Sequence, residues 1–161
     1  EILADVLVVA VPLRTNGVID AVQSRLAHYP ETYRERRIRQ AVSRLDFEYK
    51  QIRKAVRYQD EPTVIMQLAA VTRELFDLLY PLNRRWYPQA KWRYQLARDL
   101  PIQPLNLYER IGLALHDPDL RQRPVHLARL LLDTVALVQA DYDVSAATAA
   151  LEAFLKEQGQ E

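Results

Sequence analysis

The residues best suited to binding or transforming a ligand gather in one short segment, between Pro81 and Pro101. The segment holds both tryptophans and one of the four lysines, in the series Asn83, Arg84, Arg85, Trp86, Tyr87, Lys91, Trp92, Arg93 and Tyr94. Guanidinium groups bind phosphates through paired hydrogen bonds, an ammonium group binds them as a point charge, and aromatic faces stack on bases or sugars. The composition therefore indicates a phosphate-bearing ligand. In the alternative interpretation, the aromatic side chains close one end of the fold while the cations remain in solvent.

A pair of carboxylates lies further along the chain, at Asp117 and Asp119. Two carboxylates one residue apart can bind Mg²⁺ when a strand presents them. This pair instead spans Pro118 at the expected end of a helix, where aspartates commonly form turns and helix caps. We therefore predict a turn and assign no metal ligand and no catalytic residue to it.

Arg121 and His126 have the spacing found in some helical ribonucleases, where the histidine acts as a base and the arginine holds the phosphate. Pro124 lies between them and disturbs the helix that would orient them. A ribonuclease is therefore the weakest of the three functions that we consider.

Two long helices are the clearest elements. Between Glu31 and Gln59 an apolar stripe repeats at spacings of three and four residues, which predicts a helix packed along a near-parallel neighbour. Asp60 is the expected cap of the next helix, which extends to Pro81 with its own stripe. The short turn between the two predicts an antiparallel hairpin. The expected stripes are Ile38, Val42, Leu45, Tyr49, Ile52 and Val56, then Ile65, Leu68, Thr72, Leu75 and Leu79.

The remaining segments extend this pattern to an all-α bundle of five to seven helices. We expect further helices over residues 18–28, 90–100, 105–116 and 124–142, and a last one capped by Ser145. The apolar segment over residues 2–13 is either a strand or a short helix, because periodicity alone cannot decide. We assign residues 1–16 to a lead-in or the end of an upstream domain and residues 17–158 to the bundle.

The composition excludes several classes of protein. Only 3 glycines and no cysteines are present, which argues against glycine-rich phosphate loops, disulfide frameworks and thiolate metal sites. The net charge of +1 gives no sign of a nucleic-acid partner, and no apolar run is long enough for a membrane span. We expect a cytoplasmic protein. Because an apolar run begins near Glu1 without an initiator methionine, we also expect a piece of a longer protein.

The near-zero net charge conceals two opposed regions. Residues 31–59 carry nine Lys and Arg against four Asp and Glu, whereas residues 99–161 carry five against ten. These regions are either solvated faces that partly oppose each other, a basic wall beside an anionic ligand, or a surface for a separate partner.

The proline-bounded segment resembles a signature of a bacterial family similar to aminoglycoside and lincosamide nucleotidyltransferases. The resemblance rests on Leu82-Asn83-Arg84-Arg85-Trp86-Tyr87-Pro88, on Lys91-Trp92 and on Leu100-Pro101, and upstream on Gly17-Val18-Ile19 and Tyr29-Pro30. It covers roughly residues 3 to 105 and implies the helical, substrate-binding domain of such proteins. Their catalytic domain, with a Gly-Ser turn and an Asp-x-Asp pair for Mg²⁺ and ATP, has no counterpart in this chain.

The resemblance also implies roles for individual residues. Lys91 is the first candidate for a phosphate contact, followed by Asn83 and Arg84 for the nucleotide. Asp46, Glu48 and Tyr87 are candidates for the acceptor, and Trp92 is expected to anchor its helix.

Two functions from different classes follow. The first is a nucleotide- and acceptor-binding helical domain, inactive alone and part of a nucleotidyltransferase when joined to a catalytic domain that supplies the metal ligands. The second is a non-enzymatic interaction module of the kind found in toxin–antitoxin systems. In either case the leucine-rich last helices could pair across a two-fold axis as a homodimer.

Overall fold

A computed structural model of the chain describes residues 2–11 and 17–159, with the side chains of residues 2, 3, 5, 9 and 46–51 left aside. The described residues form helices and no strand. The order is α1 (Ile2–Val9), α2 (Val18–Leu26), α3 (Glu31–Arg57), α4 (Glu61–Leu82), α5 (Ala90–Leu96), the 3₁₀ turn η1 (Ala97–Asp99), α6 (Leu107–His116), α7 (Gln122–Ala136) and α8 (Ser145–Glu157).

This architecture confirms the all-α class. The apolar N-terminal segment is the short helix α1, and seven α-helices fall within residues 17–158. The assignment of residues 1–16 to a separate unit remains a prediction.

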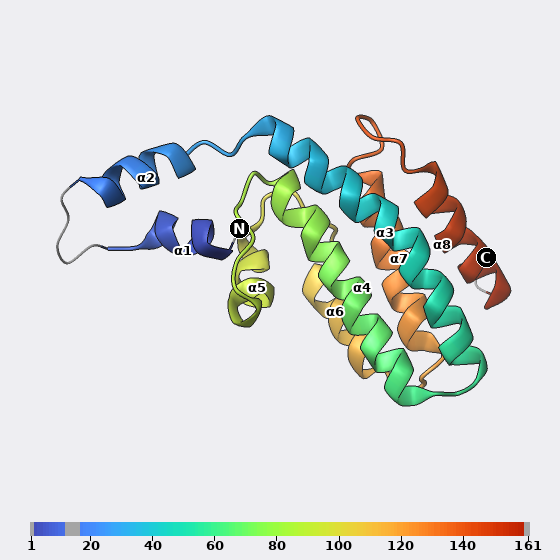
Figure 1. Cartoon of the computed structure of the whole chain (residues 1–161). Coiled ribbons are helices and arrows are strands. Elements are labelled where there is room, and N and C mark those ends of the chain that lie inside the picture. Colours follow the sequence, from blue (N-terminus) through green and yellow to red (C-terminus); the bar gives the residue numbers. More distant parts are fainter. Residues whose placement is uncertain (1, 12–16, 160–161) are drawn as a thin grey trace.

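The hairpin of α3 and α4 forms as expected and dominates the fold (Figure 1). The Asp60 carboxylate accepts hydrogen bonds from the backbone N–H of Thr63, at 3.2 Å, and from the Thr63 hydroxyl, at 2.6 Å, and so caps α4. Gln59 adopts a left-handed conformation with φ 55°, which reverses the chain between the two helices.

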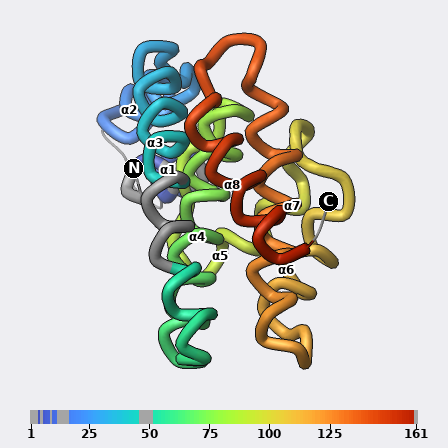
Figure 2. The backbone as a smooth tube through the Cα atoms, turned by 90° about the vertical axis from the view of Figure 1, so that its right-hand side faces the viewer, coloured from blue at the N-terminus to red at the C-terminus, as the bar shows by residue number. Residues whose placement is uncertain are grey.

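Five helices, α3, α4, α6, α7 and α8, close around one core. α3 packs on α4 and α8, and α7 packs on α4 and α8, while α6 lies against α7 and α4. Both the α3–α4 turn and the α6–α7 turn lie at the same end of this bundle (Figure 2). The largest fully buried side chains come from all five helices, among them Ile38, Leu45, Leu68, Leu75, Leu79, Ile111, Leu127, Leu130 and Phe154.

Three expectations about individual elements were wrong. Ile65 is exposed, because Val64 takes the buried position on that turn of α4. Ser145 does not cap α8; instead the Asp143 carboxylate accepts hydrogen bonds from the Ser145 backbone N–H and hydroxyl, at 3.0 and 2.6 Å. Helix α7 ends at Ala136 rather than Tyr142, because the chain then enters a series of turns.

Helices α1 and α2 form an arm at the end of the bundle opposite to the α3–α4 turn (Figure 1). The Gln23 amide donates hydrogen bonds to the carbonyls of Leu7 and Ala10, at 2.9 and 2.7 Å, and joins the two helices. The arm is fixed to the bundle by Trp86, whose indole N–H donates to the Leu26 carbonyl at 2.8 Å.

None of the described helices combines the length and the apolar composition that crossing a bilayer requires.

Candidate functional site

Two carboxylates lie buried in the last turns of α4, where nearly every neighbour is apolar. Glu74 is 1% exposed and Asp77 is 7% exposed, and they are the only buried charged residues among those described. Their spacing of three residues places them on one face of the helix. Burying a carboxylate costs free energy unless cations and hydrogen bonds compensate for its lost hydration, so the residues around this pair identify what the site can do.

Glu74 is contacted by two arginines through a single oxygen. Arg73 donates from Nη2 to Oε1 at 3.2 Å, and Nη1 of Arg44, from α3, lies 3.6 Å from the same oxygen. The other oxygen, Oε2, is buried and has no hydrogen-bond partner among the described residues. Both arginine side chains are about half exposed, at 53% and 46%, so their guanidinium groups extend from the carboxylate to the solvent.

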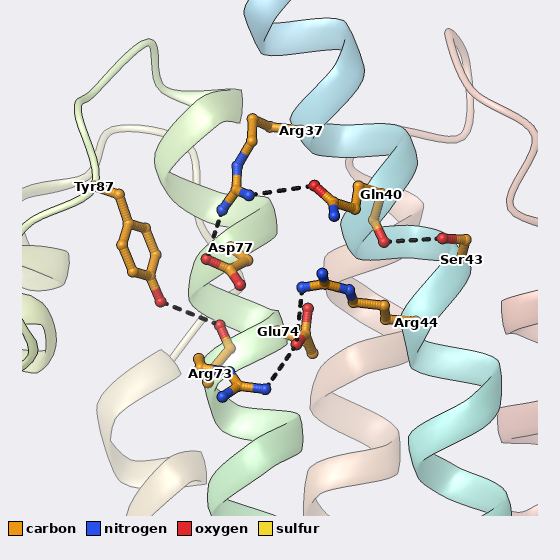
Figure 3. A network of polar contacts seen from close by, with 8 residues as sticks. All are labelled: Arg37, Gln40, Ser43, Arg44, Arg73, Glu74, Asp77 and Tyr87. Atoms are coloured by element: carbon orange, nitrogen blue, oxygen red, sulfur yellow. Dashed lines mark hydrogen bonds and ion pairs between the residues drawn. The ribbon is translucent and has the colours of Figure 1, made fainter. Parts of the chain in front are cut away.

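Asp77 has its own partner on α3. Arg37 donates from Nη2 to Oδ1 of Asp77 at 3.0 Å and from Nη1 to the Gln40 side-chain oxygen at 3.3 Å. The hydroxyl of Ser43 donates to the Gln40 carbonyl at 3.0 Å. Figure 3 shows Arg37 and Arg44 of α3 pointing toward Asp77 and Glu74 of α4, with Ser43 on the far side of α3. We call Arg37, Arg44, Arg73, Glu74 and Asp77 the α3–α4 cluster.

Tyr87 closes one side of the cluster. Its hydroxyl donates to the Arg73 carbonyl at 3.5 Å, and the guanidinium group of Arg93 lies 4.2 Å from the centre of its ring. Burial and the nearby Asp77 carboxylate raise the pKa of the Tyr87 phenol above its usual range. Tyr87 therefore stays neutral and acts as a hydrogen-bond donor at any physiological pH.

Burial and the charge of Asp77 together raise the pKa of Glu74, and the nearby Arg44 and Arg73 only partly oppose this shift. A carboxylate whose pKa is higher in the folded than in the unfolded chain binds its proton more tightly when folded. Its contribution to stability is therefore most favourable at low pH and is lost as the pH rises through the folded pKa. Above the folded pKa the ionised Glu74 is therefore a cost to the fold, and carboxyl groups with raised pKa values are common at functional sites.

We expect the variant Glu74→Gln to be more stable than the wild type at pH 7, because glutamine keeps the shape and removes the buried charge. The gain should shrink toward pH 4, where the wild-type carboxyl is protonated. Urea unfolding across this pH range measures the difference, with the exposed Glu35→Gln on α3 as control. A glutamine variant that is less stable at pH 7 would show that the ionised carboxylate serves the fold.

The cluster suits an anion better than a metal ion. A guanidinium group carries five N–H donors, and the contact with Glu74 occupies only one side of Arg44 and of Arg73. Together these two side chains form an arginine rim that Glu74 holds in place. The carboxylates already contact guanidinium groups, which does not fit a Mg²⁺ site, and the described residues contain no group of three His, Asp or Glu that could hold a metal.

The three residues predicted to bind the nucleotide have separate partners among the described residues. The Asn83 amide donates to the carbonyls of Leu79 and Ile102, both at 2.8 Å, and accepts from the Ile102 N–H at 2.8 Å, so it connects α4 to the loop after α5. Arg84 has φ 52° and contacts Glu31 at 3.2 Å. Lys91 is exposed on α5, with its ammonium 5.6 Å from the Trp92 ring centre.

The structure describes the side chain of one of the three residues that were predicted to bind the acceptor. Tyr87 lies in the cluster but is buried, with 7% of its surface exposed, so it supports the neighbouring arginines. The side chains of Asp46 and Glu48 lie outside the described part of the chain. Trp92 does not anchor its helix as expected, since it is 48% exposed. Trp86 anchors the arm instead, packing against Tyr29 with ring centres 4.7 Å apart.

The two weaker motifs have structural roles. The Asp117 carboxylate accepts from the Asp119 N–H at 2.8 Å and the Asp119 carboxylate accepts from the Arg121 N–H at 2.9 Å, which confirms the turn. His126 pairs with Asp117 at 2.9 Å, and this hydrogen bond lowers the pKa of Asp117. No contact joins His126 to Arg121 among the described residues.

None of the five cluster residues was predicted from the sequence to bind a ligand, because the aromatic and cationic residues beyond Pro81 were favoured instead. A signal was nevertheless present, because Glu74 and Asp77 are the only acidic residues between Val64 and Leu82, an otherwise largely apolar stretch. Arg44 and Glu74 are also equally far, 15 residues, from Gln59 in the turn. In an antiparallel hairpin such positions lie opposite each other.

Comparison with known proteins gives one match. The family described as "Domain of unknown function (DUF4037)" matches residues 3–93, a span that includes the arm, the hairpin and the whole α3–α4 cluster. No curated protein and no solved structure matches the chain significantly.

Proposed function

The chain belongs to the DUF4037 family, and from this premise we propose that it is the nucleotide- and acceptor-binding helical domain of a nucleotidyltransferase-like protein. In this proposal the arginine rim, Arg44 and Arg73, receives phosphate groups of the nucleotide. The proposal is supported chiefly by one observation, the buried Glu74 that contacts both arginines through one oxygen while the other oxygen has no partner.

Such a domain needs two kinds of group close together. Cations bind the phosphates, most strongly when hydrogen bonds fix their orientation, and a carboxylate or phenol can bind an amine or hydroxyl on the acceptor. The α3–α4 cluster has guanidinium groups beside two carboxylates on one face of the hairpin (Figure 3). Glu74 is in this account a positioning residue, because it aligns the two arginines without contacting the nucleotide.

Mg²⁺ and ATP are implied by the resemblance to nucleotidyltransferases, with the metal ligands outside this chain. The described carboxylates do not fit a metal site, so this domain's share is limited to binding and orienting the phosphates and the acceptor. On its own it is not expected to transfer a nucleotide, because charge neutralisation by a metal is central to that reaction.

We expect the double variant Arg44→Ala/Arg73→Ala to bind ATP at least roughly tenfold more weakly than the wild-type chain, since one charge-assisted hydrogen bond contributes about 1.5–3 kcal/mol. Calorimetric titration with ATP, with and without Mg²⁺, measures the effect. Arg85→Ala removes an exposed arginine outside the cluster and is the matched control. Equal affinity in the double variant and the wild type would refute the proposed phosphate site.

Lys91 is the second phosphate candidate and is tested in the same titration. The side chain is exposed and forms no ion pair with a described residue, so Lys91→Ala should weaken ATP binding without lowering the melting temperature. An unchanged affinity for ATP would show that Lys91 does not contact the phosphates and would leave the arginine rim as the proposed phosphate site.

The alternative function, an interaction module, is favoured by the N-terminal arm. Val8, Val11 and Val18 are 41%, 85% and 59% exposed there, and contiguous exposed apolar surface is typical of sites that bind another protein. Sedimentation equilibrium tests the alternative. Self-association of the wild-type chain that is lost in a Val11→Asp/Val18→Asp variant would support the interaction module. A wild-type chain that is monomeric at all concentrations would exclude pairing through this arm.

A further inference from the structure

A second basic site lies at the end of the bundle where the hairpin turns. A pocket of about 590 Å³ opens there between the last turns of α3 and α8 and the start of α7. Four cations and two side-chain amides line it: Arg53, Lys54, Arg57, Arg121, Gln59 and Gln158. We call it the end groove. Its lining lies beside the α3–α4 turn, which Figure 1 shows at the opposite end of the bundle from the arm.

Only one of the four cations is neutralised by a described carboxylate. Arg53 donates from Nε to Oε2 of Glu157 at 3.0 Å and its Nη2 contacts Oε1 of the same residue, so this guanidinium is held by a bidentate contact. Lys54, Arg57 and Arg121 form no ion pair or side-chain hydrogen bond with any described residue. The acidic Asp119 accepts only from the Arg121 backbone N–H.

Three of the four cations, Arg53, Lys54 and Arg57, share the last turns of α3, where helix spacing makes them neighbours and the helix dipole favours positive charge. Arg121 joins them from the start of α7, and no helix periodicity requires this fourth cation to meet the other three. Like charges gathered in a concave surface repel one another and concentrate anions from solution. Elsewhere Arg37 and Arg44 of α3 form ion pairs with carboxylates of α4, whereas Lys54, Arg57 and Arg121 meet without a described carboxylate to pair with.

We propose that the end groove is a binding site for a compact anion with several phosphate groups, such as an inorganic oligophosphate or the oligophosphate part of a nucleotide. Arg57 and Arg121 can each donate paired hydrogen bonds to phosphate oxygens, and Lys54 adds a point charge. The amides of Gln59 and Gln158 can donate further hydrogen bonds. The pocket volume suits a small molecule, and the single carboxylate is already occupied by Arg53.

This site is independent of the α3–α4 cluster and does not rest on the proposed function. The two sites share no residue. The groove is lined by residues at and near the α3–α4 turn, whereas the cluster residues lie between the middle of α3 and α4 and the ends of these helices away from the turn. Each can therefore be removed without altering the other.

Titration of the chain with inorganic tripolyphosphate, at low salt in a calorimeter, tests the proposal. We expect saturable binding of one equivalent at the groove, weakened roughly tenfold or more in Arg57→Ala/Arg121→Ala. The Arg44→Ala/Arg73→Ala and Arg85→Ala variants should retain the same groove affinity as the wild type. Circular dichroism shows that each variant is folded, which is expected because the replaced groove side chains are exposed.

Two results would overturn the proposal. One is the absence of tripolyphosphate binding, or binding that the groove variant leaves unchanged. The other is binding of a single-stranded RNA oligonucleotide through the groove residues without binding of tripolyphosphate, which would show that the groove follows a polymer backbone rather than holding a compact anion.

Discussion

Replacing Phe154 with alanine should destabilise the chain by about 3–5 kcal/mol, the usual cost of removing a fully buried phenylalanine side chain. Phe154 on α8 has no exposed surface and belongs to the core that α3, α4, α7 and α8 enclose. Its loss leaves a cavity that the helices around it can only partly fill. The size of the effect tests whether α8 is part of the bundle or an appendage to the hairpin.

Urea unfolding monitored by circular dichroism gives the free energy of unfolding for both chains. Leu113→Ala is the matched control, because Leu113 is 49% exposed on α6 and should cost little. A loss below about 1 kcal/mol for Phe154→Ala, within the range of ordinary surface substitutions, would mean that α8 does not close the core as described.

Replacing Arg37 with alanine should destabilise the chain by about 3 kcal/mol, because it leaves the Asp77 carboxylate buried without its cation. The two side chains are only 17% and 9% exposed and their atoms lie 3.0 Å apart. The cost comes mainly from the Asp77 carboxylate, which stays buried after its cation is removed.

A second variant separates the cost of leaving Asp77 without its cation from the net contribution of the Arg37–Asp77 pair to the free energy of unfolding. Arg37→Met/Asp77→Leu replaces both partners by apolar residues, which is often neutral or stabilising for a buried ion pair. We expect its stability to lie within about 1 kcal/mol of the wild type, well above Arg37→Ala. If Arg37→Ala costs less than about 0.5 kcal/mol, the pair behaves as a solvated surface contact and the burial of Asp77 is not a feature of the site.

Helix periodicity was sufficient to predict the fold class and the hairpin. Ile38, Val42, Leu45 and Ile52 of the predicted α3 stripe are buried, because the stability of a long amphipathic helix depends on which side chains leave water. The side chain of Tyr49 lies outside the described part of the chain. Caps were less predictable: Asp60 caps α4, but Asp143 takes the role expected of Ser145. Both residues are good caps, and only the backbone geometry at the helix end decides which one the N–H groups reach.

The candidate site was predicted poorly for a physical reason. Residue type indicates where a ligand could be bound, but the availability of a side chain depends on tertiary partners. Asn83 has the chemistry to bind a nucleotide, yet its amide is satisfied by the backbone of Leu79 and Ile102. Glu74 was not predicted as a site residue, because its role depends on Arg44, which the hairpin places opposite it. Pairs of residues that face each other across a hairpin can be predicted from their distances to the turn. This prediction is most useful for charged residues that lie inside apolar stretches.

The central claim is that the arginine rim held by Glu74 receives the phosphates of a nucleotide. The most direct measurement is a titration of the ¹⁵N-labelled chain with ATP, observed at the Nε–H signals of the arginine side chains. We expect the signals of Arg44 and Arg73 to shift together and to saturate. When either arginine is replaced by alanine, the ATP concentration at which the signal of the other is half shifted should rise about tenfold or more. Arg44 and Arg73 signals that remain unmoved through the titration would contradict the account.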